Sequence, residues 1–126
     1  MSRRLKRRPT DGELEILQVL WNLGPSTVRR VHETMGSTAA YTTTLKLLQI
    51  MHGKGLVRRD ETGHAHIYEA TPEKDETRLL LARDLAERAF SGSTARLALH
   101  ALSSARASAE ELAEIRALLD RLEGSS

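Results

Sequence analysis

The hydrophobic pattern of the chain opens with an amphipathic helix. Thr10 is followed three residues later by Glu13, which is a capping-box signal, and the apolar positions after it recur at helical spacing. Gly24 and Pro25 end the pattern, because neither residue continues a helix well. The predicted apolar face is formed by Leu14, Leu17, Val19, Leu20 and Trp21.

Two further helices follow after very short connections. The pattern predicts one helix from about Ser26 to Gly36 and another over about 41–54, which Gly55 ends. Residues 37–40 between them form only a short turn. Three helices with so few residues between them must pack as a compact cluster.

Residues 56–70 have the pattern of a β-hairpin. Leu56 and Val57 open one extended run, and residues 65–68 form another. Gly63 lies between the runs, where it is expected to supply the positive φ that a tight hairpin often needs. A helix, a short turn and a helix, followed by a β-hairpin, is the order of elements in a winged helix-turn-helix domain.

The last part of the chain is again helical. Pro72 interrupts the pattern, since the residue before a proline avoids the α region. Helices are then predicted over about 74–90 and 94–103. A last helix begins at Ser108, where Glu111 completes a second capping box.

These C-terminal helices form a region too small to be stable alone. Their apolar stripes include a single aromatic residue, so they would make a marginal domain. We expect the stripes to pack against a second copy of the chain, which predicts a homodimer; the alternative is packing against the N-terminal domain of the same chain. The predicted interface consists of Leu79, Leu85, Phe90, Leu112, Ile115, Leu118, Leu119 and Leu122.

The pattern therefore predicts a mostly α fold with a small β-hairpin, divided into three regions. These regions are a basic arm over residues 1–9, a winged helix-turn-helix domain over 10–71 and a helical dimerisation domain over 72–126. The arm holds Arg3, Arg4, Lys6, Arg7 and Arg8 without an acid, although the net charge of the whole chain is only +2. A basic arm on a near-neutral body indicates a polyanionic partner; the alternative is a disordered, solubilising tail.

Composition excludes several classes of protein. The 126 residues include no cysteine, so disulfides, thiolate metal sites and a cysteine nucleophile are ruled out. No apolar run approaches the roughly 20 residues of a membrane span, and no apolar segment follows the basic N-terminus as in a secretory signal. We therefore predict a cytoplasmic protein without membrane insertion.

The third predicted helix has one face without acidic residues. At about 100° per residue, six side chains point to the core and the others to the opposite side. The core set is Tyr41, Thr44, Leu45, Leu47, Leu48 and Met51. The opposite face carries Thr42, Lys46, Gln49 and Gly53, with Thr43 and Ile50 at its edge.

Such a face suits the major groove of DNA, which admits one helix. Threonine offers a hydroxyl and a methyl group to base edges, lysine reaches phosphate or guanine, and glutamine pairs with adenine. The hairpin would place basic residues on flanking phosphate. The predicted DNA-binding residues are Thr42, Thr43, Lys46, Gln49, Ile50, Arg58, Arg59 and His64.

Nearly the whole chain resembles the penicillinase-repressor family, the BlaI/MecI/CopY type of bacterial winged-helix regulators. The similar segments are ELEILQVLW (13–21), GPSTVRRVHE (24–33), AYTTTLKLLQIM (40–51), KGLVRR (54–59), GHAHIY (63–68) and SAEELAEIRALLDRL (108–122). The resemblance implies a homodimeric repressor bound to an inverted-repeat operator. It also implies release when a membrane-bound metalloprotease sensor triggers cleavage of the repressor.

The chain departs from the family pattern at three places. Ile50 stands where many members carry arginine, so one basic contact is missing, and His64 also replaces an arginine. The pair His100-Ala101 aligns with the Asn-Phe bond that is cut in the staphylococcal members. Without cysteine, the copper-responsive input of the family is excluded.

Two other functions are alternatives to DNA binding. His64 and His66 would share one face of a strand, but a metal site would need a third ligand, such as His32 or His52, so no metal or cofactor is predicted. No phosphate loop, nucleophile elbow or His-Glu-x-x-His motif is present, so no enzyme is predicted. A winged helix that binds protein instead of DNA would carry apolar anchors on the exposed face of the third helix, where only Ile50 qualifies.

Overall fold

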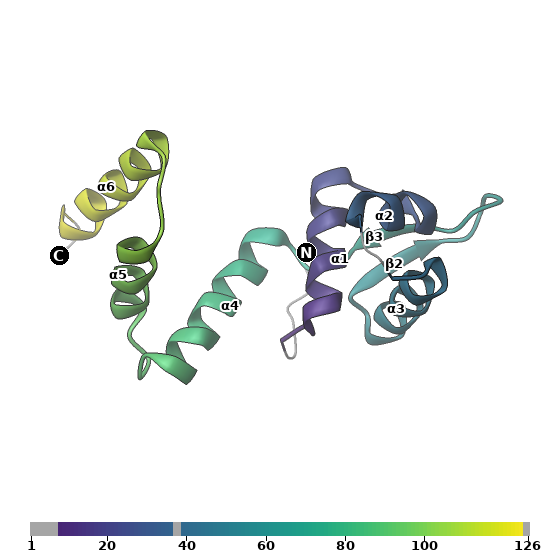
Figure 1. Cartoon of the computed structure of the whole chain (residues 1–126), viewed down its shortest axis with the longest axis horizontal. Helices are drawn as coiled ribbons and strands as arrows, with labels where there is room; N and C mark the ends of the chain where they lie inside the picture. The colour runs from purple at the N-terminus through teal and green to yellow at the C-terminus, as the bar shows by residue number, and fades with distance from the viewer. Residues whose placement is uncertain (1–7, 37–38, 125–126) are drawn as a thin grey trace. The chain divides into compact units, whose positions relative to one another are not determined.

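The computed structural model describes residues 8–36 and 39–124. The helices and strands follow the predicted order (Figure 1). The helices are α1 (Asp11–Leu23), α2 (Val28–Met35), α3 (Tyr41–Lys54), α4 (Lys74–Ala89), α5 (Thr94–Ser104) and α6 (Ala109–Gly124). The strands are β1 (Ser26–Thr27), β2 (Val57–Asp60) and β3 (Ile67–Ala70).

The first helix begins at the predicted capping box. The backbone N–H of Thr10 donates to Glu13 Oε1 at 2.9 Å, and the N–H of Glu13 donates to Thr10 Oγ1 at 3.3 Å. The predicted apolar face omitted Ile16, which is completely buried. Burial is deepest at Ile16, Leu17 and Leu20, because these positions lie three and four residues apart on one stripe.

The sheet has a third strand that the sequence analysis missed. Ser26 pairs with Tyr68 and Thr27 with Ile67, which gives the antiparallel strand order β1-β3-β2. Because β1 occupies Ser26 and Thr27, the second helix begins later than predicted, at Val28. Thr27 is its N-cap, and its Oγ1 accepts from the N–H of Arg30 at 3.2 Å.

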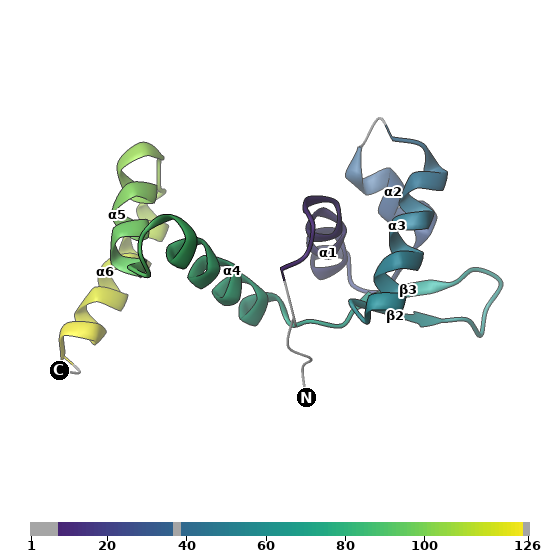
Figure 2. The same ribbon diagram turned by 90° about the horizontal axis from the view of Figure 1, so that it is seen from below.

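The hairpin of β2 and β3 forms a wing, residues 57–70, that extends beyond the helices (Figure 2). Residues 61–66 connect the two strands, so the loop is longer than the tight turn that the sequence suggested. Gly63 does not have a positive φ, and its predicted role in the turn was wrong. Asp60 Oδ1 instead accepts hydrogen bonds from the N–H and Oγ1 of Thr62, which starts the loop and lowers the pKa of Asp60.

The helices α1–α3 and the two strands of the wing contribute to one core. Buried side chains from α1, α2, α3, β2 and β3 contact one another and fix the angle between the helices and the wing. The buried apolar core consists of Ile16, Leu17, Leu20, Val28, Val31, Leu48, Met51, Val57 and Tyr68. α3 therefore has its position set by the helices before it and by the sheet after it.

An ion pair also connects the end of α3 to the start of α1. Lys54 Nζ lies 2.6 Å from Glu13 Oε2, and the Glu13 side chain is only 3% exposed. Burial raises the pKa of Glu13, but hydrogen bonds from Lys54 and Thr10 outweigh that effect, and the pKa is lowered overall. The carboxylate therefore stabilises the fold in its ionised form.

We expect Glu13→Gln to lower the free energy of unfolding by about 1–2 kcal/mol near neutral pH, because a charged hydrogen bond to Lys54 is lost. The folded-state pKa of Glu13 lies below its ordinary value of 4.5, so the stabilisation is present above that pH. It disappears as the pH falls through the folded-state pKa. Urea unfolding of the two proteins should therefore converge in acid.

The matched control is Glu15→Gln, which removes an exposed carboxylate from the same helix. Its unfolding midpoint should stay close to that of the wild type throughout the pH range. A Glu13→Gln deficit that persists unchanged in acid would contradict the role of the ionised carboxylate.

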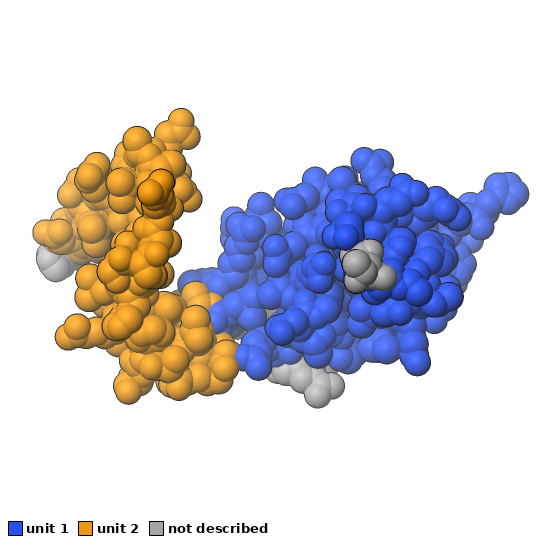
Figure 3. Space-filling view, viewed as in Figure 1, with its two compact units in different colours: residues 1–81 blue, residues 82–126 orange. Residues whose placement is uncertain are grey.

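By contacts, the chain divides into two compact units, residues 1–81 and 82–126 (Figure 3). The division falls inside α4, whereas the domain boundary predicted at residues 71–72 stays a prediction. Pro72 is buried in the first unit, where its carbonyl accepts a hydrogen bond of 3.0 Å from Trp21 Nε1. Pro9, placed by the sequence at the end of the basic arm, is also buried, and residues 1–7 of that arm lie outside the described residues.

The second unit contains α5 and α6. Ser108 and Glu111 form the predicted capping box, with bonds of 2.9 and 3.0 Å. Neither helix contains a fully buried residue, so much of their apolar stripes stays exposed. Within the described ranges, no helix is both long enough and apolar enough to cross a bilayer.

Candidate nucleic-acid interface

The residues of α3 that were predicted to contact DNA are all exposed. Gly55, in the left-handed conformation, ends the helix, and Thr44, Leu48 and Met51 anchor its opposite side in the core. No acidic residue occurs in α3. The exposed residues from the predicted set are Thr42, Thr43, Lys46, Gln49 and Ile50.

These side chains form rows along the helix, because residues four apart lie on the same side. Thr42, Lys46 and Ile50 make one row, and Ile50 is 43% exposed. Thr44 is only 2% exposed and its Oγ1 lies 2.8 Å from His32 Nδ1 of α2. The three consecutive threonines therefore divide as predicted, with one inside and two at the surface.

Tyr41 lies at the surface, which corrects its predicted place in the core. It is 40% exposed. Its ring contacts His32 edge-on, with 5.7 Å between the ring centroids. The guanidinium of Arg29 lies over the ring at 5.7 Å from its centroid.

Both arginines of the wing that were predicted to contact DNA form ion pairs with carboxylates of the wing. Arg58 Nη2 lies 2.6 Å from Glu69 Oε1, and Arg59 Nη2 lies 3.0 Å from Glu61 Oε1. The Arg58 side chain remains 69% exposed, whereas that of Arg59 is 21% exposed. Hydrogen bonding to Tyr68 also raises the pKa of Arg59. The wing therefore presents less unpaired positive charge than its sequence suggests.

The two histidines of the wing lie in its loop. β3 begins at Ile67, so the expectation that His64 and His66 share one face of a strand was wrong. The residue pairs between β2 and β3 include neither histidine, and His66 Nε2 instead lies 3.7 Å from Glu61 Oε1. Across residues 8–36 and 39–124, no group of three or more His, Cys, Asp or Glu side chains gathers as metal ligands would.

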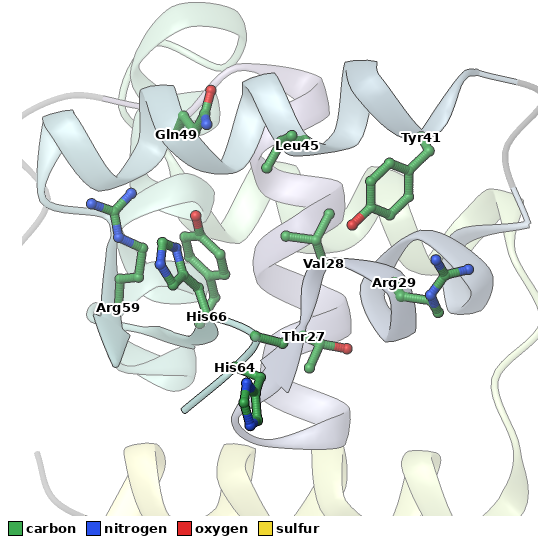
Figure 4. A pocket seen from close by; sticks show the side chains of 11 residues that line it. Thr27, Val28, Arg29, Tyr41, Leu45, Gln49, Arg59, His64 and His66 are labelled. Carbon is green, nitrogen blue, oxygen red and sulfur yellow. The ribbon is translucent and has the colours of Figure 1, made fainter. Parts of the chain in front are cut away.

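A groove of about 640 Å³ separates α3 from the wing and from the start of α2 (Figure 4). We call it the helix–wing groove. Its apolar floor has basic and hydroxyl-bearing side chains around it, and no carboxylate lines it. The lining residues are Thr27, Val28, Arg29, Tyr41, Leu45, Gln49, Arg59, His64, Ala65, His66 and Tyr68.

Among the residues that line the groove, Gln49, Arg59 and His64 were predicted from the sequence to bind DNA. Arg29 and Tyr41 were not predicted to do so. The signal for Arg29 was weak, because a basic residue near a helix start is common on protein surfaces. Tyr41 was missed because a helical wheel gives the direction in which a side chain points but not how far it is buried. A surface of this kind, with basic and hydroxyl groups and without acids, is suited to a polyanion.

The predicted dimer residues lie on α4, on α6 and just after α4. Leu79, Leu118 and Leu122 are 51%, 46% and 61% exposed. Leu85 and Leu119 are also exposed, while Phe90, Leu112 and Ile115 are half-buried. Two leucines of α5 outside the predicted interface, Leu99 and Leu102, are also exposed.

A helix with an acid-free exposed face, the helix that precedes it and a β-hairpin wing are the elements of a winged helix-turn-helix regulator. Comparison with known proteins agrees. The profile of the penicillinase repressor family matches residues 9–121. The chain belongs to the penicillinase-repressor family, as the resemblance predicted.

The relatives are named as regulators of transcription. Transcriptional regulator BlaI of Mycobacterium tuberculosis, in strains CDC 1551 and H37Rv, is 35% identical over 118 residues, which are 89% of this chain and 84% of the relative. A MarR family protein from Bacillus stearothermophilus shares the fold, with a TM-score of 0.52 and 24% identity, over 94% of this chain and 76% of that chain. The prediction of a DNA-binding transcriptional repressor that is not an enzyme is confirmed.

Proposed function

We propose that the chain represses transcription as a homodimer on an inverted-repeat operator, with α3 in the major groove and the wing on flanking backbone. The observation that carries this proposal is the exposed, acid-free face of α3. A helix face in ordinary solvent mixes acidic with basic residues. A face against DNA disfavours carboxylates, because phosphates and base acceptors repel them.

The start of α3 supports the same orientation. Its N-cap, Ala40, makes no side-chain hydrogen bond to the helix, and no acid lies in the first turn. Amide groups at a helix start and the positive end of the helix dipole favour a nearby phosphate. Lys46 and Gln49, further along the helix, would then face base edges. The basic arm, residues 1–9, would add further contacts to phosphates of the DNA.

The exposed leucines of α4 and α6 support the dimer. A protein rarely leaves so many leucines exposed without a partner surface. A second copy supplies an identical stripe, and two-fold symmetry of the protein matches an inverted repeat in the DNA. Cleavage by a membrane sensor protease stays a prediction from the family; the aligned pair, His100-Ala101, is exposed within α5.

Binding to duplex DNA as a function of salt tests the proposal. The logarithm of the binding constant should fall linearly with the logarithm of the salt concentration, by about 0.9 for each phosphate contact. Selection of bound fragments from the host genome should then yield two half-sites in inverted orientation. A chain that retains protein partners but shows no salt-dependent DNA binding would be an interaction module, and the proposal would fail.

A further inference from the structure

We infer that the helix–wing groove holds one sugar–phosphate backbone of the duplex, and that Arg29 and Tyr41 contact its phosphates. This inference rests on the proposed function and goes beyond it, because neither residue belongs to the predicted DNA-binding set. It assigns a role to a surface that lies between α3 and the wing.

The geometry of DNA places a backbone at this position. A major groove and the minor groove next to it are separated by a single sugar–phosphate strand, which forms the wall that they share. A protein that lays α3 in one groove and its wing along the next must therefore straddle that strand. The helix–wing groove is the space between these two elements (Figure 4).

The lining of the groove is complementary in charge to a phosphate strand. Arg29 stands on its α2 side and Arg59 on its wing side, and no carboxylate is part of the lining. Arg59 already has Glu61 as a partner at 3.0 Å. Arg29 has no acidic partner among the described residues, so its charge is available. The apolar floor, with Val28 and Leu45, suits the sugar edge of a backbone.

Arg29 and Tyr41 are held together before DNA arrives. The guanidinium lies over the tyrosine ring, with 5.7 Å between the guanidinium carbon and the ring centroid. The ring is held from another side by His32, and its hydroxyl points into the groove in Figure 4. A cation–π contact does not use the N–H groups of the guanidinium as hydrogen-bond donors, so they can donate to phosphate oxygens. The phenol hydroxyl adds a neutral donor beside them.

The test is Arg29→Gln, measured on a duplex of random sequence over a range of salt concentrations. Loss of one phosphate contact should lower the magnitude of the log–log slope by about 0.9, which corresponds to about eightfold weaker binding at 0.1 M salt than the wild type, with convergence near 1 M. The matched control is Arg30→Gln, because Arg30 is the exposed neighbour on the same helix but does not line the groove. Its slope should equal that of the wild type.

Two more variants separate charge from stacking. Arg29→Lys keeps the charge and should restore the slope, although its stacking on Tyr41 differs. Tyr41→Phe keeps the ring and loses only the hydroxyl, so affinity should fall without a change of slope. Circular dichroism confirms that each variant is folded before its slope is interpreted.

Equal slopes for Arg29→Gln and Arg30→Gln, whether both reduced or both unchanged, would overturn the inference. A variant of Arg29 that loses self-association but keeps DNA binding would also overturn it, because the groove would then receive a second copy. In either case the proposed function survives if wild-type binding depends on salt and the genome selection yields inverted half-sites. Absence of any DNA binding by the wild type would instead remove the proposed function itself.

Discussion

Replacing Leu118 by aspartate is expected to convert the proposed dimer into a monomer. Leu118 lies in the middle of α6 and is 46% exposed on the apolar stripe. Burying the exposed half of Leu118 contributes about 1 kcal/mol, and an aspartate in its place adds the cost of an unpaired charge in an apolar interface, so two copies should weaken the association by about 3–6 kcal/mol. That is about 10² to 10⁴ in the dissociation constant. Sedimentation velocity at micromolar concentration measures the change.

The control for this variant is Ala117→Asp. Ala117 is exposed on the same helix, about 100° away from Leu118 and on the side opposite to the middle of the stripe. The same negative charge at that position should leave the dimer intact. A wild-type chain that sediments as a monomer, or equal dissociation by both variants, would show that α6 is not the interface.

Replacing Lys46 by alanine is expected to weaken operator binding by about 1–3 kcal/mol if its side chain reads a base. Lys46 is exposed at the centre of the acid-free face of α3, one helical turn from Thr42 and from Ile50. Its side chain contributes nothing to the core, so the thermal unfolding midpoint should stay near the wild-type value. Binding to the selected operator and to random duplex should be measured in parallel.

The comparison between the two duplexes decides the role of Lys46. A base contact gives a loss on the operator that exceeds the loss on random DNA, whereas a phosphate contact gives equal losses. Lys74→Ala removes a charge from the start of α4, outside the proposed interface, and serves as the control. An unchanged operator affinity for Lys46→Ala would contradict the placement of α3 in the major groove.

Local signals predicted each helix, although the start of α2 was placed two residues too early. The predicted third helix and α3 have the same bounds, because Gly55 ends the helix in a left-handed conformation and Leu48 and Met51 mark its buried side. The capping boxes at Thr10 and Ser108 were equally visible, since each is completed within three residues. Features of this kind depend only on neighbours along the chain, so they can be predicted without knowledge of the fold.

Contacts between distant segments were not predictable in the same way. β1 has only two residues and exists because Ser26 pairs with Tyr68, far along the chain. The ion pair between Arg58 and Glu69 depends on the register of the wing, which the sequence left open. The helix–wing groove combines α2, α3 and the wing, so its charge pattern emerges only after all three have packed.

The hydrogen bond between Trp21 and the carbonyl of Pro72 gives the molecule an internal spectroscopic reporter. Trp21 is the single tryptophan of the chain, and its indole N–H is engaged at the point where the winged domain leads into α4. The emission of an indole depends on its hydrogen bonding and on its contact with water. Intrinsic fluorescence therefore follows this junction selectively, without a label, during titration with DNA.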